Sequence, residues 1–548
     1  MRLASGRQLE GAGLPTVHLT MTVTRDVLKH ASIYSFASIM GKAVGFLMLP
    51  FYARIFQTQG YGIVGMVDAA INLLLSLFGY GMGAGLVRIY HEEKDPSKGA
   101  VISTGLWLLW MAGGPVIGVL ALASRPLSSL LFGDGKFAGF LVLALLALLF
   151  DLTGYAAGSY LLIRQRSVSL SVVSVARLLL GLTLNIVLII VLRWGLAGYF
   201  VSSIATAAVN SIALHAIALR ACGCKFDRRI ARKIVGFEAP LVPGRMVSFI
   251  SRQLERVLVR YQIGLDSVGV LEMGYKFPPL LSMLISDPFM ASWNTKRVEL
   301  ASRGPAAVEI GRMLTYYIFI VGFAGVLLAT NLDLLFELLI PREFWSAVRI
   351  GRVEIVTTIL TGASLHLMFG LYFSKDTRTI SLISGTTSIF KVVLSYALIS
   401  SYGLSGAAYS ALVTATVQAV WMTLAGQRSY RVRIEYAKIA VMCGCGFAIA
   451  YAAAVADYAQ IPVLGRVQAA VPALLAAVCG HETVRRGFPG QILGHLVTGG
   501  PTIGRILART LMASSFLLLG FVVHPRPASA ARRFLTGFRR LGSPPMTP

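Results

Sequence analysis

Four arginines recur at nearly helical spacing in one predicted helix, at 234–260. They are Arg245, Arg252, Arg256 and Arg260. At about 100° per residue, the first three lie within about 40° of one another, and Arg260 lies about 40° beyond Arg256. A guanidinium can hold a phosphate through two parallel hydrogen bonds. The stripe therefore predicts a binding site for an anionic ligand that carries phosphate.

The surroundings of the stripe leave a second interpretation open. Glu238 and Glu255 could neutralise part of it, and the outer arginine could reach the membrane interface. Two carboxylates leave two of the four arginines uncompensated. Pro240, Pro243 and Gly244 interrupt the start of the helix, and broken helices often form the binding sites of transporters.

Further basic residues inside predicted spans are Lys42, Arg177 and Lys391, which together with the stripe could line one basic cavity. Each could equally pair with a neighbour or extend to the interface. Glu272 and Lys276 are four residues apart, in the order that favours a pair on a helix. Either they satisfy each other, or Glu272 pairs with the 234–260 helix and leaves Lys276 for the ligand.

Acidic residues in the predicted spans could carry a coupling proton, help to hold Na⁺ or balance an arginine. The predicted residues for ion coupling or charge balance are Asp68, Asp151, Glu255 and Glu272, while Asp287 and Glu354 lie nearer to predicted span ends. The Cys-Gly-Cys pairs at 222–224 and 443–445 do not have zinc spacing. We therefore predict no catalytic residue, no metal site and no cofactor besides a coupling ion.

The composition requires that these residues sit in a membrane. The chain has 548 residues, of which 56% are hydrophobic and 14% charged, with a mean hydropathy of +0.71. A soluble domain needs more charge to cover its surface. Apolar runs of about 20 residues, long enough to cross the hydrocarbon core, recur at 31–53, 62–87, 101–124, 138–162, 168–192, 196–219, 234–260, 268–291, 311–330, 350–373, 379–400, 404–426, 435–455 and 462–480. The fold class is therefore an all-α multi-pass membrane protein with about fourteen spans.

The net charge of +26 reflects how the chain is oriented in the membrane. No solvated basic domain is present to hold nucleic acid, and the Lys and Arg residues gather in alternate connections. This bias predicts a multi-pass membrane protein with both termini in the cytoplasm. The apolar stretch 508–523 is short for a span, so we expect it to lie in the interface rather than to form a fifteenth helix.

A weak internal repeat divides the chain. Gly62 aligns with Gly269 at an offset of 207, and Gly195-Leu-Ala-Gly198 matches Gly403-Leu-Ser-Gly406 at an offset of 208. Each unit has six spans, so both have the same orientation in the membrane. The predicted parts are a cytoplasmic tail (1–30), an N-lobe (31–219), a basic linker (220–233), a C-lobe (234–426), helices 13 and 14 (427–480) and a C-terminal tail (481–548).

Three segments carry a resemblance to a known family. They are ASIYSFASIMGKAVGFLMLPFYARIFQTQGYGIVGMVDA, PLVPGRMVSFISRQLERVLVRYQIGLDSVGVLEMGYK and LISSYGLSGAAYSALVTATV. Over 25–480 the chain resembles the polysaccharide transporters, the Wzx-type O-antigen and exopolysaccharide flippases of the multidrug/oligosaccharidyl-lipid/polysaccharide flippase superfamily. Many relatives have an Asp-Arg pair where this chain has Glu255 and Arg256, which keeps the charge pattern.

The resemblance implies two six-helix lobes in a V-shaped, MATE-like arrangement around a cationic cavity. It also implies that the protein moves an undecaprenyl-pyrophosphate-linked oligosaccharide across the inner membrane by alternating access, coupled to an ion gradient. The implied partners are this lipid-linked substrate, membrane lipids, a polysaccharide polymerase and the export machinery.

Two alternatives remain. A MATE-like drug/cation antiporter would need an acidic cavity, against which the intramembrane Arg and Lys argue. A membrane polymerase or transferase acting on lipid-linked sugars generally needs a long extracytoplasmic loop or a polar catalytic cluster, and every predicted outer connection is short. We therefore expect a transporter and not an enzyme.

Overall fold

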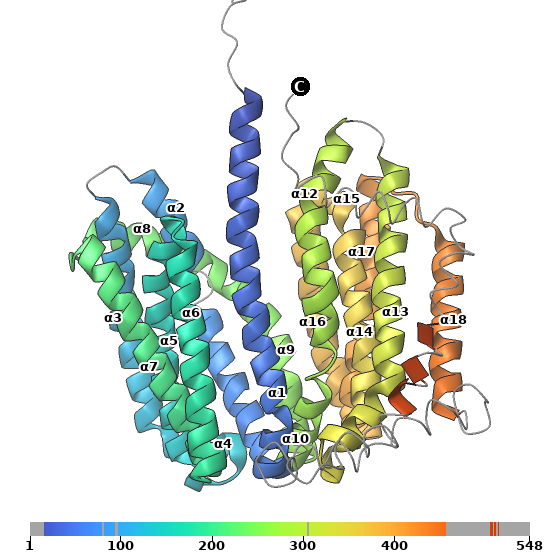
Figure 1. The fold of residues 1–548 in the computed structure, drawn as a ribbon, viewed down its shortest axis with the longest axis horizontal. Helices are drawn as coiled ribbons and strands as arrows, with labels where there is room; N and C mark the ends of the chain where they lie inside the picture. The colour runs from blue at the N-terminus through green and yellow to red at the C-terminus, as the bar shows by residue number, and fades with distance from the viewer. Residues whose placement is uncertain are drawn as a thin grey trace, which may run out of the picture. The chain divides into compact units, whose positions relative to one another are not determined.

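The computed structural model describes residues 16–78, 82–93, 97–303, 306–455, 505–507, 509–510 and 513–514. Its numbered α-helices (Figure 1) are α1 (Thr16–Phe78), α2 (Met82–Glu92), α3 (Lys98–Leu122), α4 (Ser124–Phe132), α5 (Ala138–Ile163), α6 (Ser167–Asn185), α7 (Gly195–Cys222), α8 (Arg228–Glu238), α9 (Val242–Gln262), α10 (Leu265–Gly274), α11 (Pro279–Leu281), α12 (Asp287–Arg303), α13 (Ala307–Leu339), α14 (Ala347–Leu367), α15 (Phe369–Phe373), α16 (Thr377–Tyr402), α17 (Leu404–Ser429) and α18 (Tyr436–Val455). Short 3₁₀ and π segments connect some of them, and the described residues contain no strand.

Within the described residues, nine helical stretches are long and apolar enough to cross a membrane. They are Val44–Phe78, Lys98–Leu122, Gly135–Ile163, Val168–Val191, Gly195–Cys222, Ala307–Leu339, Ala347–Phe373, Thr377–Tyr402 and Leu404–Ser429. The protein is therefore an all-α multi-pass membrane protein, as predicted. Every predicted span from 31–53 to 435–455 overlaps a described helix, and the span 462–480 lies outside the described residues.

The predicted and observed elements differ at three places. Helix α1 begins at Thr16, inside the segment predicted as a tail, because no Gly or Pro interrupts 16–30. The first two predicted spans meet at Gln57 (φ 55°) without an intervening loop. The predicted helix 234–260 is divided into α8 and α9 by a 3₁₀ turn at Ala239–Leu241, where Pro240 lies and just before Pro243.

The repeat recurs in the backbone geometry. Gln57 and Gly264 are separated by the offset of 207, and both have positive φ, of 55° and 140°. Gly195 and Gly403, at the offset of 208, have φ of 56° and 58° and each opens a helix. Helix α6 packs on α7, as α16 packs on α17. The same turns and pairings thus occur in both halves of the sequence.

The chain forms two compact units. The first unit holds Met1–Met48, Phe78–Ser124 and Gly139–Leu241, and the second holds Leu49–Leu77, Arg125–Ala138 and Val242–Pro548. The last 29 residues of α1 before Phe78, Leu49–Leu77, therefore pack with the second half of the chain. The predicted lobe boundaries at 31–219 and 234–426 stay a prediction.

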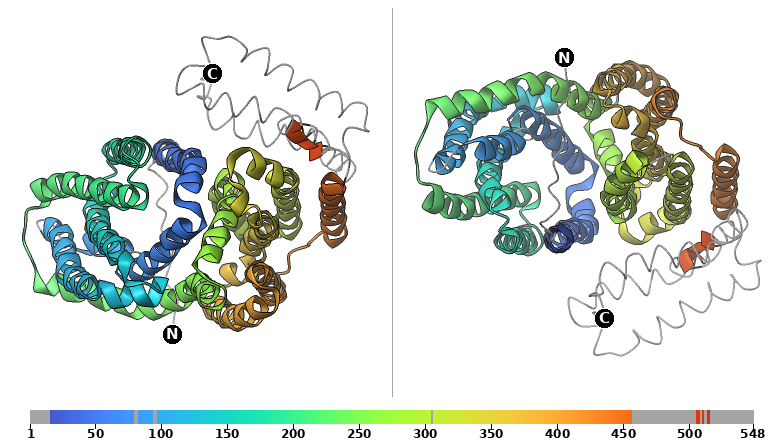
Figure 2. Two further views of the ribbon diagram at one scale, coloured as in Figure 1. Left: turned by 90° about the horizontal axis from the view of Figure 1, so that it is seen from below. Right: turned by 90° about the horizontal axis from the view of Figure 1, so that it is seen from above.

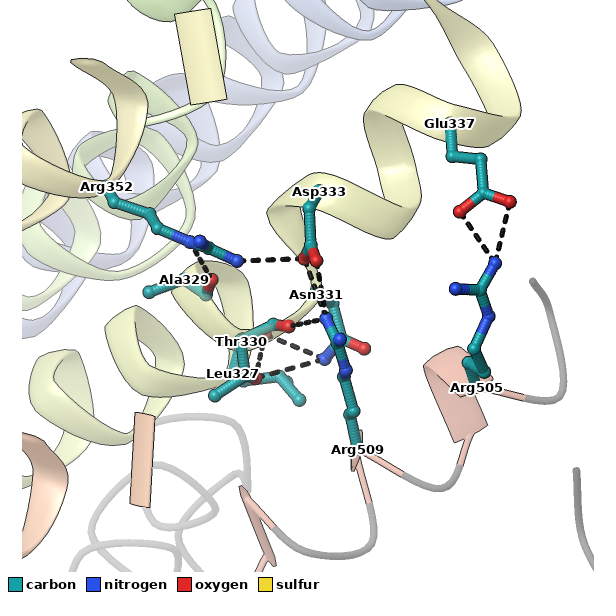
Figure 3. A network of polar contacts seen from close by, with 9 residues as sticks. All are labelled: Leu327, Ala329, Thr330, Asn331, Asp333, Glu337, Arg352, Arg505 and Arg509. Atoms are coloured by element: carbon teal, nitrogen blue, oxygen red, sulfur yellow. Dashed lines mark hydrogen bonds and ion pairs between the residues drawn. The ribbon is translucent and has the colours of Figure 1, made fainter. Parts of the chain in front are cut away.

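A short C-terminal stretch is attached to the end of α13 (Figure 3). Arg509 Nη1 lies 2.7 Å from Asp333 Oδ1 and donates to the carbonyl oxygen of Thr330 at 2.8 Å. Arg505 contacts Glu337 at 2.6 Å, and Arg352 of α14 contacts Asp333 at 2.9 Å. Of the predicted interfacial segment 508–523, the structure describes only 509–510 and 513–514, so its location stays a prediction.

Candidate functional site

The first feature of the site is an ion pair between α9 and α10. Arg256 Nε donates to Glu272 Oε1, and the two side chains are 17% and 8% exposed. Gly65 of α1 makes room for this carboxylate, because a Cβ there would lie 2.6 Å from Glu272 Cγ. Of the two interpretations of Glu272, the structure has the one in which it pairs with the arginine-bearing helix.

Lys276 lies one turn beyond Glu272. Its side chain is exposed and has no ion-pair partner among the described residues. Asp68 of α1 lies within electrostatic range of Lys276, Glu272 and Arg256. Lys276 is thus an exposed cation close to the buried pair.

A second ion pair joins α9 to α16. Lys391 Nζ lies 3.2 Å from Glu255 Oε2, and the side chains are 17% and 3% exposed. Glu354 of α14 lies within electrostatic range of both, and its Oε2 is buried without a hydrogen-bond partner in the described part of the chain. Glu255 therefore compensates Lys391 of another helix.

Tyr275 connects the two ion pairs. The Arg256 guanidinium carbon lies 6.0 Å from the centre of the Tyr275 ring, and the hydroxyl is within electrostatic range of Glu255 and Glu354. Together with the interactions above, these contacts connect seven charged side chains. Four are acids and three are bases: Asp68, Glu255, Glu272 and Glu354 with Arg256, Lys276 and Lys391. We call these seven residues and Tyr275 the α9 network.

The rest of the predicted stripe is only partly described. Arg260 packs against the turn after α4, since a Cβ on Gly133 (φ +80°) would lie 2.3 Å from Arg260 Nη2. Beside it, Tyr261 Oη donates to the carbonyl oxygen of Leu130 at 2.9 Å. The side chains of Arg245, Arg252 and Lys42 lie outside what the structure describes. Their part in a cationic cavity stays a prediction.

The last two candidates pair with each other in the first unit. Arg177 Nη2 of α6 lies 2.7 Å from Asp151 Oδ1 of α5, and the side chains are 39% and 35% exposed. This pair is more exposed than either pair of the α9 network, so the protein encloses it less completely.

In both ion pairs of the α9 network, the predicted cation is thus held by an acid from another helix: Arg256 by Glu272 and Lys391 by Glu255. An anionic ligand that competes with Glu272 for the Arg256 guanidinium would gain a forked contact, and Glu272 would then need a proton or a cation. The described residues contain no group of three or more His, Cys, Asp or Glu that could hold a metal ion. The arrangement suits reversible exchange of charged partners.

Two members of the network are not among the predicted site residues. The sequence indicates Glu354 as an acid near a span end, and nothing in it singles out Tyr275. Gly65 could have been found from the repeat, because it lies 207 residues before Glu272, the offset that relates Gly62 to Gly269. A crossing of two equivalent helices brings such positions together.

Comparisons with known proteins agree with this architecture. Residues 27–293 match the family model described as polysaccharide biosynthesis protein. The succinoglycan biosynthesis transport protein ExoT of Rhizobium meliloti (strain 1021) is 25% identical over 276 residues, which are 50% of this chain and 53% of that protein. The chain therefore matches about half the length of this curated relative.

Solved structures share the fold. The lipid II flippase MurJ in an inward closed conformation superposes with a TM-score of 0.60 at 13% identity, covering 88% of this chain and 98% of that chain. An inward-facing multidrug resistance MATE family transporter of the MOP superfamily gives 0.56 at 14% identity, covering 71% and 94%. At these identities the likeness concerns the fold, which is that of flippases and multidrug transporters.

Proposed function

We propose that this chain, whose residues 27–293 match the family model described as polysaccharide biosynthesis protein, is a flippase. It moves an undecaprenyl-pyrophosphate-linked oligosaccharide across the bacterial inner membrane by alternating access. The observation that carries the proposal is the buried Arg256–Glu272 pair with exposed Lys276 beside it. A charge at membrane depth costs several kcal/mol, so a chain keeps such a group where a ligand uses it.

The diphosphate is the constant anionic part of such a substrate. In the proposed binding step, a phosphate oxygen takes the place of Glu272 at the Arg256 guanidinium, and Lys276 adds a second positive charge. Arg256 is pre-positioned by Tyr275 and by its salt bridge, so little side-chain entropy is lost on binding. The sugar, which varies, would contact less charged surfaces, and this allows different glycans to share one site.

Ion coupling would use two kinds of acid: those that the substrate displaces from a basic side chain, and those that have no basic side chain of their own. Glu255 and Glu354 share Lys391, and Asp68 adjoins Glu272. Binding of H⁺ or Na⁺ to this surplus of negative charge would favour one conformation over the other. Asp151 and Arg177 of the first unit are a second candidate pair for the same role.

The proposed setting follows from the chain's charge pattern and its relatives. Both termini lie in the cytoplasm, a polymerase and export machinery receive the product, and the chain itself catalyses no covalent reaction. ExoT, by its description, is a transport protein of succinoglycan biosynthesis, and an exopolysaccharide unit is the corresponding substrate here.

A drug/cation antiporter is the second candidate. The described part of the α9 network has four acids and three bases, so an excess of carboxylate is available for a cationic substrate. The fold shared with a multidrug transporter is compatible with it.

A complementation assay separates the two. The host is a bacterium whose own lipid-linked-sugar flippase is deleted. The variants are Lys276→Gln and, as a control at another exposed basic residue, Arg431→Gln, at matched protein levels. We expect wild type and Arg431→Gln to restore surface polysaccharide and Lys276→Gln to fail. Full activity of Lys276→Gln would refute the site. Failure of the wild type with several glycan systems, together with lower sensitivity to cationic drugs, would favour the antiporter.

A further inference from the structure

Helix α8 is a short amphipathic helix fixed to the first unit. Its buried side includes Ile230, Ala231 and Ile234, which are at most 7% exposed. Ile230 and Ile234 belong to the hydrophobic core that α2, α3, α5 and α7 form. Viewed along the bundle, α8 is seen lengthwise at one side of the first unit (Figure 2). Its start is tied to the first turns of α3, because the amide of Asp227 donates to Thr104 Oγ1 at 3.0 Å and Ser103 Oγ donates to the carbonyl oxygen of Lys225 at 2.6 Å. It therefore lies at the level where the membrane spans α3 and α7 begin and end.

Polar contacts fix which way α8 faces. Asp227 caps its first turn by accepting from the backbone amide of Arg229 at 2.7 Å. Arg229 Nη2 lies 2.6 Å from Glu93 Oε2, and Lys233 donates to the other oxygen of the same carboxylate. Glu93 follows α2 directly, so two of the four basic residues of α8 are used to hold the helix on the bundle.

The other two basic residues of α8 have no such use. Arg228 and Arg232 are one turn apart, exposed, and without an ion-pair partner among the described residues. Arg228 also lies in the first turn, where the helix dipole disfavours a cation. Helix stability therefore does not account for them. Solvation by water could account for the two arginines alone. However, apolar side chains lie in the same exposed region, since Phe226 is 45% exposed and Val235 is 51% exposed.

We propose that this surface binds the headgroups of anionic phospholipids in the leaflet at which α8 lies. The surface comprises Arg220, Lys225, Phe226, Arg228, Arg232 and Val235, all of them exposed. Basic side chains mixed with exposed apolar ones, at the ends of membrane spans, are the combination that anchors helices at a charged bilayer surface. The occupant is a phospholipid because the surface is rigidly mounted at headgroup level and extends over more than one turn of helix. The proposal does not depend on the transported substrate.

The test compares lipid binding by the purified full-length protein. Native mass spectrometry with equal amounts of phosphatidylglycerol and phosphatidylcholine measures which lipid stays bound to wild type, to Arg228→Gln/Arg232→Gln and to Arg428→Gln/Arg431→Gln. The last variant removes two exposed basic residues near the end of α17 and matches the change in net charge. Unchanged thermal melting confirms folding, since neither Arg228 nor Arg232 makes an ion pair in the described structure.

We expect wild type and the Arg428/Arg431 control to prefer phosphatidylglycerol. The α8 variant should lose roughly 10- to 30-fold of that preference, the effect of about two surface cations. Equal preference in all three proteins would overturn the proposal. Displacement of phosphatidylglycerol by inorganic pyrophosphate at equimolar concentration would also overturn it, because the surface would then be a site for free or substrate-borne diphosphate.

Discussion

Gly62 of α1 and Gly269 of α10 bring their helices together by two equivalent contacts. A Cβ on Gly62 would lie 2.1 Å from the carbonyl oxygen of Leu265, and a Cβ on Gly269 would lie 1.9 Å from that of Thr58. Leu265 follows Thr58 by the 207 residues that separate the glycines. The crossing therefore has local two-fold pseudosymmetry, and Thr58 Oγ1 closes it by donating to Asp266 Oδ1 at 2.7 Å.

Substitution of Gly269 by alanine should destabilise the protein. The added Cβ meets backbone on the facing helix, which cannot rotate away, so the helices must separate. We expect a loss of about 1–3 kcal/mol or more, measured as a lower melting temperature in detergent. The matched control is Gly118→Ala on α3, where a Cβ meets nothing within 4 Å and where alanine should be neutral or slightly stabilising. Equal melting of the two variants would refute the close contact.

Much of this architecture could be predicted from the sequence because its signals are local. Apolar runs of span length located the helices, and the two repeat landmarks at offsets of 207 and 208 identified turns that have matching positive φ at Gly195 and Gly403. The division at Pro240 is also visible, since Pro240, Pro243 and Gly244 fall close together there, whereas the single Pro50 and Pro115 lie inside α1 and α3.

Most charge pairs could not be predicted, because they depend on which helices face each other; only the pairing of Glu272 with the 234–260 helix is offered by the sequence, as one of two alternatives. The sequence offered Glu238, Glu255 and Glu272 as partners for the arginines. In the structure Arg256 pairs with Glu272, while Glu255 pairs with Lys391, 136 residues away. Helical periodicity gives the face of a residue on its own helix but not the neighbouring helix. The estimate of a surplus of two arginines omitted Glu272 and Lys391 and was therefore incomplete.

Removal of Arg256 should separate its structural role from its functional one. Arg256→Ala leaves Glu272 buried without its ion-pair partner, which costs about 3–5 kcal/mol. Arg256→Met/Glu272→Gln removes both charges and should recover most of the melting temperature while surface polysaccharide remains absent. The exposed pair Arg88 and Glu92, 2.8 Å apart, gives the control Arg88→Met/Glu92→Gln, with an expected change of about 0–1 kcal/mol. Restored polysaccharide in the Arg256/Glu272 double variant would show a purely structural pair.

Glu255 and Glu354 should respond in opposite ways to neutralisation. Glu255→Gln removes the partner of Lys391 at 3.2 Å and should lower the melting temperature. Glu354 has a buried Oε2 without a described hydrogen-bond partner, so Glu354→Gln should leave the melting temperature unchanged or raise it. If Glu354 carries the coupling ion, this stable variant should still lose complementation. An equal loss of stability in both variants would contradict the assignment of Lys391 to Glu255.

Arg509 should hold the C-terminal stretch on α13 more strongly than Arg505 does (Figure 3). The Arg509 side chain is 9% exposed and the Arg505 side chain 32% exposed. Arg509→Ala should therefore destabilise the attachment of the described residues 505–507, 509–510 and 513–514 by about 3 kcal/mol, and Arg505→Ala by less than about 1 kcal/mol. Hydrogen exchange of these residues measures both. Asp333 keeps Arg352 at 2.9 Å in either variant, so exchange in α14 should not change.

The attachment of α8 should depend on pH through Glu93. The hydrogen bond from Lys233, with Arg229 nearby, lowers the pKa of the Glu93 carboxyl below its ordinary value. A carboxyl with a lowered pKa contributes stability above its unfolded pKa, about 4.3, and that stability is lost as the pH falls through the folded value.

Protection of α8 amides from hydrogen exchange, corrected for intrinsic rates, should thus be constant from neutral pH to about pH 5 and fall below about pH 4. Glu93→Gln cannot form the charged contact and should show lower protection that changes little over this range. The two proteins should differ at neutral pH and converge in acid, because protonated Glu93 and glutamine are both uncharged. A parallel decline in both would assign the acid sensitivity of α8 to another group.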